Sequence, residues 1–252
     1  GWKCEIQGKI DGVLCRTYVD DMTAARERTG PLDSGVAIIG QMQTISALFE
    51  ADFHLKRNLV KSVRFSSDPL TREELALTPG EVVSHTFVDL GVDQSVTAQP
   101  SLVKRTKRSE SVLDKYGRIC LVAIPLRLRG IVAAAAGTCS GLYGAAAAAI
   151  PMADLRAMRK AALRAAWRNV YRVAQEVVFG LFFSWRLDPL AQAVVKPWVY
   201  LQGAVSRGLT TAAELCWLWT ACPDCFVGPI AAAKQALRIA GLAGPPDHLM
   251  HG

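Results

Sequence analysis

Thr17-Tyr18-Val19-Asp20-Asp21-Met22 places two adjacent carboxylates between two strand-like runs of the chain. The run before them, Val13 to Tyr18, is rich in apolar and β-branched residues, and a further apolar run, Met22 to Ala25, follows them. Strand-forming residues on both sides of a short acidic stretch are typical of a β-hairpin. We therefore expect two antiparallel strands with Asp20 and Asp21 at the turn between them.

A helix is expected next along the chain. Pro31-Leu32-Asp33-Ser34 is a helix-start signal, and apolar residues recur behind it at helical spacing. They are Ile38, Met42, Ile45, Leu48 and Phe49. The pattern then predicts a strand at 60–65, a polar loop at 66–80 with a short helical turn at 71–76, and a strand pair within 82–92. This part of the chain is therefore predicted to be α+β.

The sequence changes character after Pro100. The basic segment Lys104-Arg105-Thr106-Lys107-Arg108 is followed by long stretches rich in Ala, Leu and Arg, which favour helices over strands. We place a domain boundary near residues 98 to 104, and expect Pro and Gly between 197 and 229 to divide the last third into short helices. The predicted regions are an α+β part at 1–102, a helical part at 103–180 and a helical extension at 181–252.

The net charge of +7 and the pI of about 9.2 indicate a polyanionic partner, either nucleic acid or an anionic membrane surface. Seven cysteines, an odd number at irregular spacing, do not indicate a disulfide framework but a reducing intracellular compartment, the nucleus or the cytoplasm.

The stretch from Gly130 to Ala153 has no charged residue, but Ala and Gly dominate it. A membrane-spanning helix needs roughly 20 strongly apolar residues, so we expect buried helix there rather than a span.

The paired acids suit a hard divalent cation, Mg²⁺ or Mn²⁺. Such ions prefer carboxylate oxygens and keep waters and substrate phosphates as their other ligands. Two of them can stabilise the attacking and leaving oxygens of an in-line phosphoryl transfer. Because acidic pairs are also common in ordinary hairpin turns, Asp20 and Asp21 alone do not establish a metal site.

Four short motifs occur in an order that resembles reverse transcriptases. Tyr18-Val19-Asp20-Asp21 resembles the family's hairpin motif, and Asn58-Leu59-Val60-Lys61-Ser62 resembles the Asn-x-x-Lys-Ser/Thr element that follows its palm helix. Phe87-Val88-Asp89-Leu90-Gly91-Val92 is similar to the hydrophobic-Leu-Gly element that grips the primer. Leu142-Tyr143-Gly144, followed by a basic helix, resembles the thumb of the non-LTR retrotransposon enzymes. The resemblance covers roughly residues 10 to 175.

The resemblance implies a role for each matching residue. Asp20 would bind a metal ion, with Asp21 at the same site, and Lys61 would protonate the pyrophosphate leaving group. Lysine suits this task because its donor is mobile and its pKa falls on burial or near other cations. Tyr18 and Val19 would lie under the primer terminus, while Leu90 and Gly91 would form the turn of the primer grip. Without the resemblance, Lys61 and Gly91 read as an ordinary strand-end lysine and a turn glycine.

The implied activity is RNA-directed DNA synthesis by two-metal nucleotidyl transfer, with an RNA template, a DNA primer and dNTP. A complete enzyme of this kind also has fingers and another metal-binding Asp on a preceding strand, and the 17 residues before Tyr18 are too few to hold them. Glu5 and Asp11 lie in a different context from that acid. We therefore expect the C-terminal part of a palm followed by a thumb, inactive in primer extension as an isolated chain.

Basic residues recur, mostly every fourth position, along one side of a predicted helix. They are Arg156, Arg159, Lys160, Arg164, Arg168 and Arg172. The apolar side carries Leu155, Met158, Ala162, Leu163, Ala166 and Val170, and Asp154 alone offsets the positive charge. Like charges at this spacing repel, so a phosphate backbone is the simplest partner, and a solvated face is the alternative. We assign Arg156, Lys160, Arg164 and Arg168 to the RNA–DNA duplex.

Two other functions fit the same sequence. The chain can be a non-catalytic, nucleic-acid-binding remnant of a retroelement, or a membrane-associated helical protein in which the acidic turn is incidental. Cys222 and Cys225 could be combined with His248 and His251 into a zinc site, but the long gap between the pairs favours free cysteines. The template, the integration chemistry and the role of residues 181–252 are not specified by these patterns.

Overall fold

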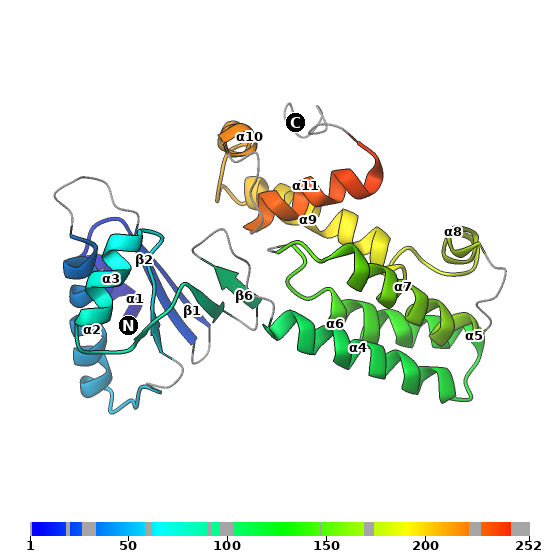
Figure 1. The fold of residues 1–252 in the computed structure, drawn as a ribbon, viewed down its shortest axis with the longest axis horizontal. Coiled ribbons are helices and arrows are strands. Elements are labelled where there is room, and N and C mark those ends of the chain that lie inside the picture. The colour runs from blue at the N-terminus through cyan, green and yellow to red at the C-terminus, as the bar shows by residue number, and fades with distance from the viewer. Residues whose placement is uncertain are drawn as a thin grey trace. The chain divides into compact units, whose positions relative to one another are not determined.

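A computed structural model describes residues 2–18, 21–26, 34–58, 62–89, 92–95, 103–146, 148–168, 174–221 and 228–242. The chain forms two compact units, residues 1–97 and residues 98–252. The division lies at the edge of the range in which the composition changes. The first unit mixes helices with short strands, and the described elements of the second are helical, so the class is α+β (Figure 1).

The first unit contains three helices and six strands among its described residues. In chain order they are α1 (Trp2–Lys9), β1 (Val13–Tyr18), β2 (Asp21–Arg26), α2 (Gly35–Asp52), β3 (Val63–Arg64), α3 (Pro69–Leu77), β4 (Val82–Val83), β5 (Thr86–Asp89) and β6 (Val92–Ser95). β1 pairs antiparallel with β2, from Val13 opposite Arg26 to Tyr18 opposite Asp21. The expected hairpin is therefore present.

The core of this unit lies between the hairpin and two helices. It consists of Ile6 and Ile10 from α1 and the residue after it, Val13 and Cys15 from β1, and Met42 and Ile45 from α2. Helix α2 follows Ser34, whose hydroxyl accepts a hydrogen bond from the Ala37 N–H, so the predicted start is confirmed. The apolar face is narrower than expected because Leu48 is 56% exposed.

The region after α2 differs in detail from the sequence prediction. The short helical turn expected at 71–76 is a nine-residue helix, α3, because Pro69 fits its first turn and the Asp68 carboxylate accepts hydrogen bonds from the Leu70 and Thr71 N–H groups. The strand pair predicted within 82–92 is two separate pairings. β4 pairs parallel with β3, and β5 forms an antiparallel hairpin with β6.

The described elements of the second unit are helical, two of them π-helical. They are α4 (Val103–Leu121), α5 (Leu126–Val132), η1 (Ala133–Thr138), α6 (Cys139–Gly141), α7 (Met152–Trp167), α8 (Gln175–Val177), η2 (Val178–Phe182), α9 (Pro189–Ser206), α10 (Ala212–Ala221) and α11 (Gly228–Ala240). Helices α4 and α7 pack on each other, and η1 packs on both. Their core includes Val112, Tyr116, Leu155, Met158 and Leu163.

A buried polar link joins three segments of this core. The Tyr116 hydroxyl is 2.7 Å from the Thr138 hydroxyl, which donates to the Leu187 carbonyl at 2.9 Å. Helix η1 can approach so closely because Gly137 faces the Tyr116 ring, where a Cβ atom would lie 2.2 Å from a ring carbon. The uncharged stretch 130–153 is divided among several of these short segments. Within the described parts of the chain, no helix combines the length and apolarity needed to cross a bilayer.

The last third contains longer helices than the sequence predicted. Helix α9 runs for 18 residues through Pro197 and Gly203. It packs against both α7 and α11, and its apolar side, including Pro197, Ala193 and Leu201, is buried. This burial outweighs the cost of an interior proline, about 3 kcal/mol. The described helices of residues 181–252 therefore belong to the same compact unit as α4 and α7.

Candidate functional site

The acidic motif lies where β1 meets β2. Tyr18 is the last residue of β1 and Asp21 the first of β2, and the two are paired across the hairpin. Val19 and Asp20 lie outside the described residues, as do the side chains of Tyr18 and Asp21. No three His, Cys, Asp or Glu side chains in the described ranges come together as a metal site. The hairpin thus gives the backbone position of Asp21, while the geometry of the acid pair stays a prediction.

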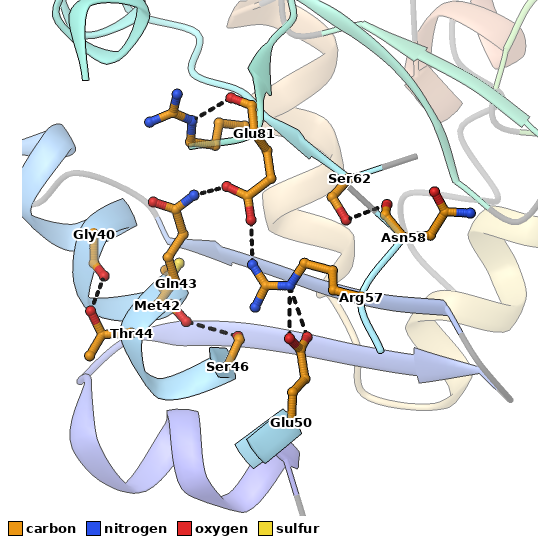
Figure 2. Close-up of polar contacts among 11 residues, drawn as sticks. Gly40, Met42, Gln43, Thr44, Ser46, Glu50, Arg57, Asn58, Ser62 and Glu81 are labelled. Carbon is orange, nitrogen blue, oxygen red and sulfur yellow. Dashed lines mark hydrogen bonds and ion pairs between the residues drawn. The ribbon is translucent and has the colours of Figure 1, made fainter. Parts of the chain in front are cut away.

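The segment that precedes the Asn58 motif is held by a cluster of ion pairs (Figure 2). The Arg57 Nε donates to both carboxylate oxygens of Glu50 on α2, at 2.9 and 3.1 Å. A second guanidinium nitrogen of Arg57 donates to Glu81, which also accepts from the Gln43 amide. Burial lowers the pKa of Arg57, but the bonds and charges of Glu50 and Glu81 outweigh it and raise the pKa overall.

A second arginine extends this cluster toward β4. Arg64 on β3 is buried, and its Nε donates to the Glu81 carbonyl at 2.8 Å. Its other nitrogens donate to the Thr78 hydroxyl and carbonyl, at 2.8 and 3.0 Å. Glu81 therefore joins α2, the segment before Asn58 and strand β3 through its side chain and its carbonyl. Because Arg57 directly precedes Asn58, this framework fixes the start of the Asn58 motif.

The Asn58 motif itself is partly described. The backbone N–H and the hydroxyl of Ser62 both donate to the Asn58 carbonyl at 3.0 Å, so hydrogen bonds join the two ends of the motif. Lys61, the residue with the expected catalytic role, lies outside the described residues. Asn58 and Ser62 therefore lie next to the arginine cluster, and the position of the lysine ammonium group stays a prediction.

The predicted primer-grip motif lies at the β5–β6 hairpin. Asp89 pairs with Val92, so Leu90 and Gly91 connect the two strands in sequence, but both lie outside the described residues. Phe87 on β5 stacks on Phe65, just after β3, with ring centroids 4.3 Å apart. This stack attaches the hairpin to the β3–β4 pair of the same unit.

The basic face of α7, in the second unit, is the most completely described of the predicted binding surfaces. Arg156, Lys160 and Arg164 are exposed, and none of the three forms a hydrogen bond or ion pair with another described residue. The opposite side of the helix is buried, as the sequence predicted at Leu155, Met158, Ala162, Leu163 and Ala166. Three solvated cations at steps of about 6 Å along one helix are available for phosphates.

Other arginines of the predicted basic face differ in role. Arg159 is only 13% exposed and pairs with Glu176 and Asp188, each at 2.9 Å, so its charge is compensated within the fold. Arg168 has a positive φ of 67° and ends α7; its guanidinium donates to the Val122 carbonyl at 3.3 Å. Because Arg168 is exposed, it can still add positive charge at this end of the helix. Arg172 lies outside the described residues.

The sequence prediction missed a basic and aromatic groove along α9. Lys196, Tyr200, Gly203 and Arg207 line it and recur at steps of four, three and four residues. That spacing places all four on one helix face and could have revealed the groove. The expected division of this region into short helices hid the pattern.

No family model, curated protein or solved structure matches this chain. The likeness to reverse transcriptases is therefore carried by the motifs quoted above. The exposed positive charge of Arg156, Lys160 and Arg164 does not depend on that likeness, because it follows from the described side chains of α7.

Proposed function

We propose that this chain is part of an RNA-directed DNA polymerase of a retroelement, with a partial palm in the first unit and a thumb-like helical unit in the second. The α7 face would bind the RNA–DNA duplex. One observation carries the proposal: Arg156, Lys160 and Arg164 project from one exposed face without an acidic partner among the described residues. Exposed faces without a polyanionic partner usually interleave acids with bases, because like charges at this spacing destabilise a helix.

The first unit supports the catalytic half of the proposal by the order of its elements. An antiparallel hairpin with an acidic connection packs on α2, the Asn58 motif follows, and a second hairpin flanks Leu90 and Gly91. Two adjacent carboxylates are a donor set that fits Mg²⁺ or Mn²⁺, and Asp20 and Asp21 would hold the ion. When bound, the metal would stabilise negative charge on the reacting phosphate oxygens. Lys61 would supply a proton to the leaving group.

The duplex assignment is tested by the salt dependence of binding. Each phosphate contact releases condensed counterions, so log K falls as log salt rises. The magnitude of this negative slope should decrease by about 0.9 for every contact removed. We expect Arg156→Gln/Lys160→Gln to lose close to two such contacts on an RNA–DNA duplex, measured by fluorescence anisotropy. Arg238→Gln on α11 is the matched control, because Arg238 is exposed and has no ion pair with a described residue. Equal slopes for the double variant and the control would show that α7 is only a solvated face.

The metal assignment is tested separately. We expect the chain to bind Mn²⁺, detected by electron paramagnetic resonance, and Asp20→Asn/Asp21→Asn to abolish this binding while leaving duplex affinity nearly unchanged. If the acid variant binds Mn²⁺ as tightly as the parent chain, the hairpin is not the metal site. Duplex binding without any metal binding would favour the non-catalytic remnant of a retroelement.

A further inference from the structure

A groove runs between residues 139–146 and helix α9 in the second unit. Its cavity volume is about 600 Å³. Lys196, Tyr200 and Gly203 on α9, with Arg207 directly after the helix, form one wall, and Tyr143 and its neighbours form the other. No Asp or Glu is among the described residues that line it. The groove is therefore positive and partly aromatic.

Lys196 lies half-buried at one end of this groove. It forms no hydrogen bond or ion pair with any other residue that the structure describes. Burial lowers its pKa, and the Cys139 side chain opposes that shift only in part. A partly desolvated ammonium group without a partner is unfavourable, so its presence in an open groove indicates an anionic ligand.

Arg207 supplies a second positive charge farther along the same wall. Its Nε donates to the Gly203 carbonyl at 2.8 Å, which draws the guanidinium back over Gly203. Gly203 and Lys196 are two turns of helix apart, about 11 Å along the axis. Because one phosphate group cannot contact both cations at that separation, the spacing favours a ligand with repeated negative charges.

Two tyrosines give the groove a surface for flat rings. Tyr143 is 52% exposed and Tyr200 is 42% exposed, one on each wall. The Arg108 guanidinium lies over the Tyr143 ring, 5.1 Å from its centroid, and adds a cation at the rim. Unpaired bases stack on exposed aromatic side chains, whereas the bases of a duplex are already stacked on one another.

We propose that this groove binds single-stranded nucleic acid, with phosphates contacting Lys196 and Arg207 and bases stacking on Tyr143 and Tyr200. Charge complementarity and the exposed rings both point to this occupant. The site is distinct from the basic face of α7 and would function whether or not α7 binds a duplex.

The test compares binding of the full chain to labelled oligo(dT) and to a duplex. We expect Tyr200→Ala to weaken oligo(dT) binding about tenfold, since one lost base stack has that order of effect. Lys196→Gln should reduce the salt slope on oligo(dT) by about 0.7, the value for one phosphate contact on a single strand. Both variants should leave duplex affinity within twofold. The double variant Arg156→Gln/Lys160→Gln should weaken duplex binding and leave oligo(dT) binding nearly unchanged, so each of the two sites is tested separately.

Controls exclude general charge effects and misfolding. Arg238→Gln removes one exposed cation outside the groove and should leave oligo(dT) binding unchanged, and Tyr200→Phe should retain stacking and restore affinity. Groove variants that bind oligo(dT) as Arg238→Gln does would overturn the proposal. Polyglutamate that competes as well as oligo(dT) at equal charge would also overturn it, because a peptide without rings does not use the tyrosines. Equal competition by dTMP would show a mononucleotide pocket instead.

Discussion

Arg57 joins carboxylates from two parts of the first unit, Glu50 on α2 and Glu81 before β4. The Arg57 side chain is 20% exposed, and those of Glu50 and Glu81 are 14% and 8% exposed. Removing one member of such a cluster leaves partly buried charges without compensation, which costs about 3 kcal/mol or more. We expect Arg57→Met to lower the free energy of unfolding by that order, measured by urea titration. Lys56→Met, one residue away and exposed, should change it by less than about 0.5 kcal/mol.

Because of Tyr116, the stability of the second unit should decrease at alkaline pH. Burial raises the pKa of its hydroxyl above the ordinary value, so the folded state keeps a proton that the unfolded chain releases above about pH 10. Stability should therefore fall as pH rises through 10. Tyr116→Phe should lose about 1 kcal/mol at neutral pH, from the missing hydrogen bond to Thr138, and its melting temperature should decline less steeply between pH 10 and 11. Equal slopes for both proteins would show that Tyr116 ionises normally.

Single residues show where sequence reasoning works and where it ends. Helical periodicity correctly identified Met42 and Ile45 as core residues, because burial follows the face of a helix. The same periodicity overestimated the burial of Leu48. It also could not distinguish the ion-paired Arg159 from the exposed basic residues beside it. Arg159 is neutralised by Glu176 and Asp188, which lie 17 and 29 residues farther along the chain. Such pairs depend on tertiary packing, which periodicity does not contain.

Among the helices, two glycines offer a matched pair of substitutions. Gly137 in η1 faces the Tyr116 ring so closely that an added methyl group has no room, whereas Gly117 on α4 is exposed and has nothing within 4 Å. Gly137→Ala should cost about 1–3 kcal/mol through overpacking. Gly117→Ala should stabilise the protein by up to about 1 kcal/mol, because alanine has the higher helix propensity. Thermal unfolding of both variants checks the difference, and a similar melting temperature for the two would contradict the tight contact.

The hairpin and α2 could be predicted from sequence because their signals are local. Strand-forming residues, an acidic turn and a helix cap each act over a few residues, and β1, β2 and α2 appear where they were expected. The continuity of α9 and the parallel β3–β4 pair could not be predicted in this way. Pro197 is tolerated because α9 is packed on α7 and α11, and β3 finds β4 across the intervening helix α3. Both depend on partners that are distant in sequence.

At the scale of the whole molecule, the change in composition after Pro100 corresponds to a physical division. The chain separates into residues 1–97, with short strands, and residues 98–252, whose described elements are helical. Each unit has its own buried cluster, one around Met42 and Ile45 and the other around Tyr116 and Met158. Separate cores allow separate unfolding transitions, so a single free energy of unfolding need not describe the chain.

Tryptophan fluorescence can report the second unit almost alone. Of the six tryptophans, only Trp2 belongs to the first unit; the others are Trp167, Trp185, Trp198, Trp217 and Trp219. Far-UV circular dichroism reports helices of both units. We expect Arg57→Met to move the dichroism transition to lower urea while the fluorescence midpoint stays unchanged, because the lost ion pairs lie wholly within residues 1–97. Gly137→Ala should shift the fluorescence midpoint, together with the part of the dichroism signal that comes from the helices of the second unit. A shift of the fluorescence midpoint in Arg57→Met, equal to that of the dichroism midpoint, would show that the two units unfold as one cooperative structure.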